Sequence, residues 1–162
     1  MRVPPVLVFG YGNPSRGDDA AGPMLIERLE ARRRAGELEG VELLTDFQLQ
    51  IEHALDLVER ELVVFVDAAA SGPGPFALTR LSPRRDASYT THAMRPEAVL
   101  QVFRETTGEG PPPAWLLAIR GYSFDLGQAP SAAAAANLDA AEGRLMRFLG
   151  ATDRPAPEPR AR

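Results

Sequence analysis

Two acidic residues and one histidine stand where an α/β fold would bring them together. Asp19 ends the segment Gly10–Asp19, which follows a first apolar run, and Asp67 directly follows a later one, Leu62–Val66. His92 lies in a loop that leads into a later helix. Two carboxylates and one imidazole form a three-ligand site with an open position, which suits a borderline divalent metal such as nickel or zinc.

Each of these residues also has a structural interpretation. Of two adjacent acids at a helix start, one caps the helix and the other complements its dipole, and we assign that role to Asp18. Asp67 is equally explained as a turn or cap residue, although a carboxylate leaving a buried strand needs hydrogen bonds or a cation. His53 and His92, each taken alone, are more simply structural. Only the combination with Asp19 and Asp67 favours His92 as a ligand.

The first loop also contains glycines that suggest a phosphate site. Gly10 and Gly12 follow a strand and precede a helix, but Ser15 stands where the dinucleotide motif needs its third glycine. Asp18 and Asp19 would oppose a phosphate at the helix start. We therefore expect no nucleotide at this loop, and the chain has no HExxH motif of a metalloprotease.

Apolar runs alternate with helical patterns, which predicts a three-layer α/β fold with a mainly parallel, twisted sheet of about five strands and helices on both faces. The expected strands are Val6–Phe9, Val41–Thr45, Leu62–Val66, Phe76–Leu81 (at an edge) and Ala114–Ile119. The expected helices are Asp19–Arg34, Ile51–Arg60, Pro96–Thr106 and Ser131–Leu149. Ligands bind beyond the carboxyl ends of strands in such sheets, where the loops carrying Asp19 and Asp67 lie.

Composition narrows the function further. The 162 residues suit one domain over 1–150, followed by a proline- and charge-rich tail, 151–162, that we expect to be disordered. The chain has no cysteine and no lysine, which excludes thiolate catalysis and Schiff-base chemistry. A net charge of −4 provides no footprint for nucleic acid. Without a signal stretch or a membrane-length apolar run, we expect a cytoplasmic monomer that binds no membrane.

Three segments together resemble one known family. Their sequences, in chain order, are VLVFGYGNPSRGDDAAG, VVFVDAAASG and TTHAMRPEAVL. They are similar to the hydrogenase maturation endopeptidases, also called hydrogenase expression/formation proteases, and the likeness covers roughly residues 5–150. The later segment IRGYSFDLG fits the same family. The residues Pro14–Gly17 depart from the usual apolar pattern and, with DFQLQIEHALDL, resemble the subgroup that serves cytoplasmic, NAD-linked hydrogenases.

The resemblance implies a function and a set of site residues. It implies an aspartyl-type endopeptidase that activates a nickel–iron hydrogenase by removing a carboxy-terminal peptide from the large-subunit precursor after nickel insertion. The family's catalytic, metal-binding residues match Asp19, Asp67 and His92, and a further acid matches Asp46. The nickel would come with the precursor, and no organic cofactor is implied. A non-catalytic nickel-binding assembly chaperone and an unrelated small metallohydrolase remain the alternatives.

Overall fold

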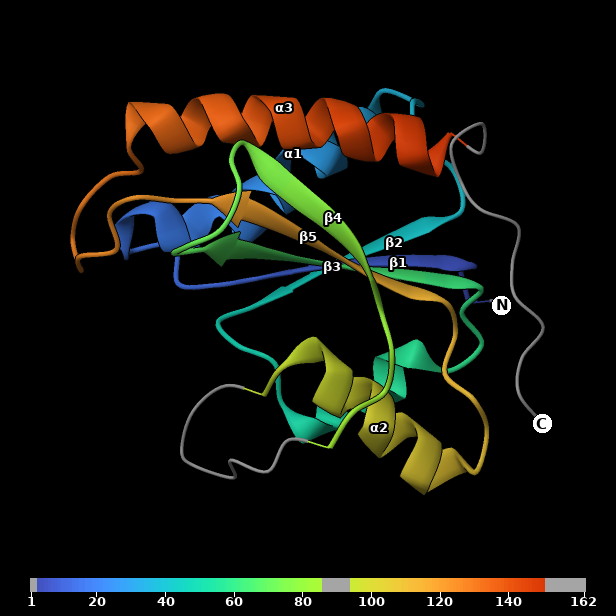
Figure 1. Cartoon of the computed structure of the whole chain (residues 1–162). Coiled ribbons are helices and arrows are strands. Elements are labelled where there is room, and N and C mark those ends of the chain that lie inside the picture. Colours follow the sequence, from blue (N-terminus) through green and yellow to red (C-terminus); the bar gives the residue numbers. More distant parts are fainter. Residues whose placement is uncertain (1–2, 86–93, 151–162) are drawn as a thin grey trace.

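A five-stranded sheet lies between two layers of helices (Figure 1). This computed structural model describes residues 3–85 and 94–150, so His92 and the predicted tail lie outside the described residues. The strands are β1 (Val6–Tyr11), β2 (Val41–Asp46), β3 (Leu62–Ala69), β4 (Phe76–Leu81) and β5 (Ala114–Arg120). The helices are η1 (Gly17–Ala20), α1 (Ala21–Arg34), η2 (Ile51–Leu57), α2 (Pro96–Thr107) and α3 (Ala132–Leu149), of which η1 and η2 are 3₁₀ helices.

The strand order confirms the predicted mainly parallel fold. It is β2-β1-β3-β5-β4, with every neighbouring pair parallel except β4 and β5. In the centre, Val8 of β1 is paired with Leu43 of β2 on one side and Val64 of β3 on the other. Strands covered on both faces read as continuous apolar runs, which is why β1 and β3 could be predicted. β4 lies at the edge, as expected.

Each face of the sheet has its own core. In β1, Val6 and Val8 belong to one core and Leu7 and Phe9 to the other, because successive side chains of a strand point to opposite faces. Helices α1 and α3 cover the first face, and η2 and α2 cover the second (Figure 1). None of the described helices combines the length and the apolar character needed to cross a bilayer.

One predicted helix is shorter in the structure than expected. The helix expected at Ile51–Arg60 is the shorter 3₁₀ helix η2, because the chain leaves the helical path at Val58 to enter β3. The guanidinium of Arg60, buried there, bonds to the carbonyl of Pro4 at 2.8 Å and to the Glu42 carboxylate at 2.9 Å. These contacts secure the turn in a non-helical conformation.

The acidic residues of the first loop and of β3 also lie differently from the prediction. Asp19 belongs to the 3₁₀ turn η1, and the α-helix begins only at Ala21. β3 extends beyond the predicted Val66, because its pairing with β5 continues to Ala69. Asp67 is therefore part of the strand, where a ladder neighbour on β5 limits its backbone.

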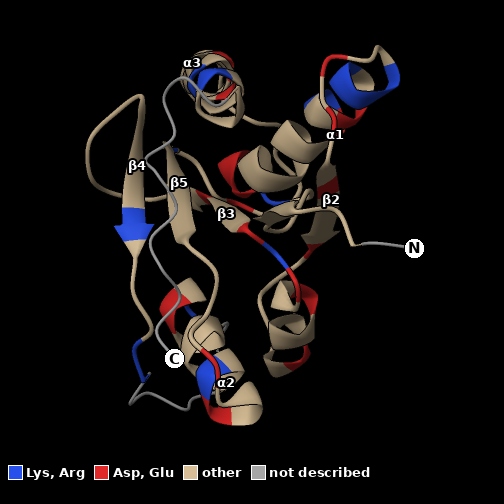
Figure 2. Cartoon of the chain, turned by 90° about the vertical axis from the view of Figure 1, so that its right-hand side faces the viewer, with Lys and Arg blue, Asp and Glu red and all other residues tan. Residues whose placement is uncertain are grey.

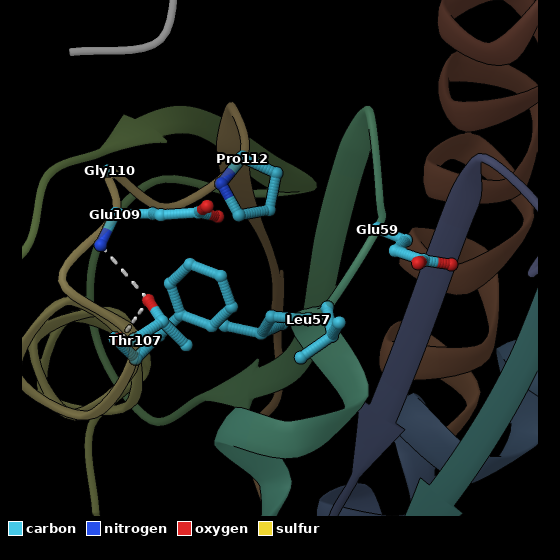
Figure 3. A pocket seen from close by; sticks show the side chains of 8 residues that line it. Leu57, Glu59, Thr107, Glu109, Gly110 and Pro112 are labelled. Atoms are coloured by element: carbon cyan, nitrogen blue, oxygen red, sulfur yellow. Dashed lines mark hydrogen bonds between the residues drawn. The ribbon is translucent and has the colours of Figure 1, made fainter. Parts of the chain in front are cut away.

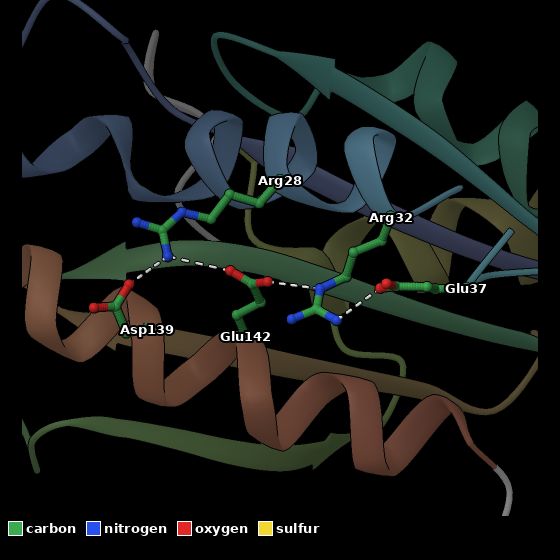
Figure 4. Close-up of polar contacts among 5 residues, drawn as sticks. All are labelled: Arg28, Arg32, Glu37, Asp139 and Glu142. Carbon is green, nitrogen blue, oxygen red and sulfur yellow. Dashed lines mark hydrogen bonds and ion pairs between the residues drawn. The ribbon is translucent and has the colours of Figure 1, made fainter. Parts of the chain in front are cut away.

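The arginines of α1 connect that helix to α3 (Figure 4). The guanidinium of Arg28 contacts Asp139 at 2.5 Å and Glu142 at 3.1 Å, and Arg32 Nε donates to Glu142 at 2.7 Å. Arg32 also pairs with Glu37 at 3.0 Å. Figure 2 shows the positive charge gathered at the end of α1. Arg28 and Arg32 therefore serve to join the two helices on this face of the sheet.

Candidate active site

The carboxyl ends of the parallel strands bring the candidate acids to one edge of the sheet. Asp46 is the last residue of β2 and is paired with Tyr11, the last residue of β1. Gly10 of β1 pairs with Val66 of β3, which places Asp67 level with Tyr11 on the other side. The side chains at positions 46, 11 and 67 thus come from three adjacent strands. The loop that carries Asp19 starts from the middle one.

The backbone of the first loop wraps around Asp19. The Asp19 carboxylate accepts a hydrogen bond from the Asn13 backbone N–H at 2.7 Å. The Asn13 side chain in turn accepts one from the Ser15 N–H at 2.9 Å, which confirms that this amide shapes the turn. Gly12 has φ +146°, and a Cβ there would lie 2.1 Å from the Asp19 carbonyl oxygen. Only glycine permits this approach.

Asp67 is held in a half-buried environment with an elevated pKa. Its carboxylate accepts a hydrogen bond from the Ala68 N–H at 2.8 Å and another from the Tyr11 hydroxyl. Burial is the main reason that its pKa rises to about 7, and the negative charge of Asp19 adds to it. The hydrogen bonds from Ala68 and Tyr11 act in the opposite direction. Asp19 and Asp67 are therefore close enough to interact electrostatically.

Tyr11 is a component of this site that the sequence did not reveal. Its ring is buried, and its own pKa lies well above the usual value because of burial first and the Asp67 charge second. The hydroxyl thus stays protonated and serves as a donor to Asp67. The signal available in the sequence was its position as the last residue of the first apolar strand, flanked by Gly10 and Gly12.

Asp46 is paired with a histidine instead of with the other two acids. Its Oδ1 accepts from the Phe47 N–H at 2.7 Å, and its Oδ2 lies 3.1 Å from His53 Nε2. His53 Nδ1 accepts from the Gln50 N–H at 2.8 Å, so Nε2 carries the proton that is donated to Asp46. His53 is buried against the ring of Phe9, with the ring centroids 4.6 Å apart.

Two of the three predicted metal ligands, Asp19 and Asp67, lie within the described residues. Asp19 and Asp67 come together as expected, and His92 lies outside the described residues. Within residues 3–85 and 94–150, no group of three or more histidine and acidic side chains is arranged to hold a metal ion. Two carboxylates that raise each other's electrostatic cost nevertheless form an environment that a cation would stabilise.

Asp18 is structural, but its side chain caps neither η1 nor α1, at whose start we placed its role. Its buried carboxylate accepts hydrogen bonds from the N–H groups of Tyr122, Ser123 and Ser131, at 2.7, 3.0 and 2.6 Å, and from the Ser131 hydroxyl at 2.8 Å. Burial raises the pKa of this group, but the four hydrogen bonds outweigh it and the pKa lies below 3.8. Asp18 therefore joins the loop after β5 to the start of α3.

The cavity in Figure 3 lies away from these acids. It has a volume of about 370 Å³ and is lined mainly by residues that follow η2 and α2: Leu57, Val58, Glu59, Phe103, Thr107, Glu109, Gly110 and Pro112. These segments lead into the amino ends of β3 and β5, whereas Asp67 lies near the carboxyl end of β3. The cavity is thus at the opposite edge of the sheet and does not contribute to the candidate site.

Comparison with known proteins supports the architecture at the level of structure. No protein-family profile matches the sequence, and no curated protein does. Solved structures that share this fold include hydrogenase maturation proteases. The [NiFe] hydrogenase maturation protease HycI from Thermococcus kodakarensis KOD1 is 23% identical, with a TM-score of 0.69 over 91% of this chain and 93% of that one.

Two further structures agree. The hydrogenase maturating endopeptidase HybD from E. coli is also 23% identical, with a TM-score of 0.69 over 98% of both chains. A hydrogenase 2 maturation peptidase from Thaumarchaeota archaeon SCGC_AB-539-E09 is 24% identical, with a TM-score of 0.63 over 90% of this chain and 97% of that one. At these identities the likeness shows a shared fold over nearly the whole chain.

Proposed function

We propose that this protein is an endopeptidase that removes a carboxy-terminal peptide from the nickel-loaded large-subunit precursor of a nickel–iron hydrogenase. The observation that carries the proposal is the electrostatically coupled pair Asp19 and Asp67 at the carboxyl edge of the sheet. This pair occurs in the fold shared by proteins named as hydrogenase maturation proteases. The precursor as client follows from those names and from the sequence resemblance.

The nickel would belong to the precursor. Asp19, Asp67 and His92 supply two carboxylates and an imidazole, which are suitable ligands for nickel, and the chain has no cysteine to complete a closed site. Ligands from the precursor would fill the remaining positions, so binding would depend on nickel having been inserted. The negative charge shared by Asp19 and Asp67 supports this role, because a cation between them would relieve their repulsion.

Asp67 is the better candidate for the general base. Asp67 would act as base with its carboxylate released from the nickel, and a pKa of about 7 without metal then keeps part of the carboxylate ionised at neutral pH and able to accept a proton. Water would attack the carbonyl carbon of the scissile bond and transfer its proton to Asp67. That proton would then pass to the leaving amine nitrogen as the C–N bond breaks. Tyr11 would orient the Asp67 carboxylate through its hydroxyl.

The client would be a cytoplasmic hydrogenase of the NAD-linked kind, and the enzyme would act as a monomer. The segment DFQLQIEHALDL and the residues Pro14–Gly17 support this subgroup. Asp46 would assist at the edge of the site, where His53 keeps its carboxylate in one orientation.

The decisive experiment is mass spectrometry of the nickel-loaded precursor after incubation with this protein. We expect loss of one carboxy-terminal peptide, and no loss from nickel-free precursor. Asp67→Asn keeps the shape of the side chain and should slow cleavage by about a hundredfold or more. His92→Ala tests the third ligand. An intact precursor that still binds in a nickel-dependent way would instead establish the chaperone alternative.

A further inference from the structure

A row of exposed apolar side chains lies on the segment between β2 and β3. We call it the η2 surface, and it consists of Phe47, Ile51, Leu55 and Val58, whose exposed fractions are 66%, 53%, 68% and 42%. Single exposed apolar residues are common on proteins, but several large ones gathered within one short segment indicate a surface that another molecule covers.

The η2 surface is supported by buried residues. The residues between its members, His53, Ala54 and Leu57, are buried in the core beneath η2. The His53 ring also links Gln50 to Asp46, because it accepts from the Gln50 N–H at 2.8 Å and donates to Asp46 at 3.1 Å. The exposed side chains are therefore presented from an ordered backbone, which limits the entropy lost when a partner binds.

The η2 surface starts beside the candidate active site. Phe47 directly follows Asp46, and Asp46 is paired with Tyr11, whose hydroxyl binds the Asp67 carboxylate. A polypeptide with its scissile bond at Asp67 could thus continue across Phe47 onto η2. The cavity at the far edge of the sheet shares Val58 with the other end of the η2 surface and lies away from Asp67.

The charge of this segment defines the partner further. Residues 46–59 contain four acids, namely Asp46, Glu52, Asp56 and Glu59, and no arginine or lysine. Glu52 and Glu59 are exposed and directly follow Ile51 and Val58 of the apolar row in the chain. An acidic apolar surface repels nucleic acid and anionic membranes, and it attracts a polypeptide that carries both apolar and basic side chains.

We propose that the η2 surface is the docking site for a basic, amphipathic segment of the precursor, separate from the peptide that is cleaved. This inference rests on the proposed function and adds a second contact to it. Apolar side chains of the precursor segment would cover Ile51 and Leu55, while its arginine or lysine side chains would approach Glu52 and Glu59. Such a contact would hold the client without taking part in hydrolysis.

The first test is cleavage kinetics of the nickel-loaded precursor with the double variant Ile51→Ser, Leu55→Ser. We expect KM to rise about tenfold with kcat nearly unchanged, since loss of a central apolar contact commonly weakens binding by that much. Leu126→Ser is the matched control, because Leu126 is 65% exposed but follows β5 outside the η2 surface. Circular dichroism should show the same melting behaviour for all three proteins.

The second test separates charge from apolar contact. Glu52→Lys should raise KM several-fold, and the effect should shrink at high salt. Glu39→Lys makes the same charge change on an exposed residue at the amino edge of the sheet and should leave KM unchanged.

The outcomes distinguish failure of the docking proposal from failure of the peptidase proposal. If the wild type cuts the precursor and the double variant has the same KM, the docking proposal is wrong and the peptidase proposal stands. An equal rise in KM with Leu126→Ser, or dimerisation that the double variant abolishes, would also overturn it. If the wild type binds without cutting, the same comparison is made on Kd. Neither cutting nor binding would overturn both proposals.

Discussion

The carboxyl group of Asp67 is held near the middle of its titration at neutral pH. Burial and the charge of Asp19 raise its pKa to about 7, so that the folded protein favours the protonated form more than an unfolded chain does. Ionising this group lowers the stability of the folded protein, and the same raised pKa makes the group reactive near neutral pH. Catalytic groups commonly reduce stability in this way.

Replacing this carboxyl should stabilise the protein in a pH-dependent way. Between pH 3.8 and 7 the unfolded chain loses the Asp67 proton before the folded one, so wild-type stability falls as pH rises, and above pH 7 the full cost is present. We expect the free energy of unfolding of Asp67→Asn to exceed that of wild type by roughly 2 kcal/mol at pH 8, with about 4 kcal/mol as an upper limit. Near pH 3.5 the two proteins should be equally stable. Urea unfolding at several pH values measures this. A gain that does not change with pH would contradict it.

The hydroxyl of Tyr11 should lower the pKa of Asp67. It donates to the carboxylate, which stabilises the ionised form. In Tyr11→Phe this donor is absent, so the titration midpoint of Asp67 should move above about 7. Carbon-detected NMR of the side-chain carboxyl in metal-free protein follows the midpoint directly. A midpoint that stays in place would show that the hydrogen bond contributes little.

Individual residues were predictable to different degrees. The positions of Asp19 and Asp67 followed from strand ends in a parallel sheet, whereas the contacts of Asp18 with the loop after β5 and with the cap of α3 did not. The pairing of Asp46 with His53 did not, because it depends on the 3₁₀ path of η2. Sequence patterns describe which face is apolar, but they do not determine how tightly a short helix winds.

At the scale of elements, β1 and α1 pack through glycines. A Cβ on Gly22 would lie 2.6 Å from the carbonyl oxygen of Tyr11 and 2.8 Å from that of Val66. Both are strand backbone atoms with ladder neighbours, so neither can move aside easily. A Cβ on Gly10 would similarly lie 2.5 Å from the Gly22 oxygen. This contact sets how close the first loop comes to the carboxyl edge of the sheet.

Alanine at this contact should destabilise the protein despite its better helix propensity. We expect Gly22→Ala to cost about 3 kcal/mol or more, since the steric cost exceeds the roughly 1 kcal/mol that alanine contributes within a helix. Gly143→Ala in α3 is the matched control, because its nearest neighbour is a flexible arginine end at 3.8 Å, and it should stabilise by about 0.5–1 kcal/mol. Thermal unfolding of the two variants should therefore shift in opposite directions.

The larger elements were predicted well because their patterns are long. Pro96–Thr106 and Ser131–Leu149 match α2 and α3 to within a residue at each end, aided by proline at the first turn of one and serine at the cap of the other. β3 was underestimated because its last residues are small and polar, and its length depends on pairing with β5. Such pairing is not a local property of the sequence.

At the scale of the whole molecule, Asp18 unites segments that are more than a hundred residues apart in the chain. It binds the loop at Tyr122 and Ser123 and the cap of α3 at Ser131. The parallel fold was predictable from alternating apolar runs, but this closure was not, because the partners are backbone N–H groups with no sequence signature. The Asp18 carboxylate thus closes the carboxyl edge together with backbone bonds between the same loops, such as Asp18 N–H to the Ser123 carbonyl at 2.7 Å.

Removing that carboxylate should weaken the fold as a whole. Asp18→Ala leaves three N–H groups of part-buried hydrogen bonds without their acceptor, and we expect a loss of about 3 kcal/mol or more. Ser131→Ala removes the cap and only one of these contacts and should cost about 1 kcal/mol. Because the pKa of Asp18 is lowered, its contribution is complete above pH 3.8 and is lost as pH falls through the folded-state value. Urea titrations at pH 7 and pH 3 should show the difference between Asp18→Ala and wild type narrowing.

The amino edge of the sheet, which carries none of the candidate acids, offers a turn where foreign sequence can be inserted. Gly108, which ends α2, has φ +73° and no atom within 4 Å of where a Cβ would stand. It lies at the amino edge, away from Asp67. Exposed turns of this kind tolerate foreign domains, so a fluorescent protein or an affinity handle inserted after Gly108 would leave the acid-bearing edge free.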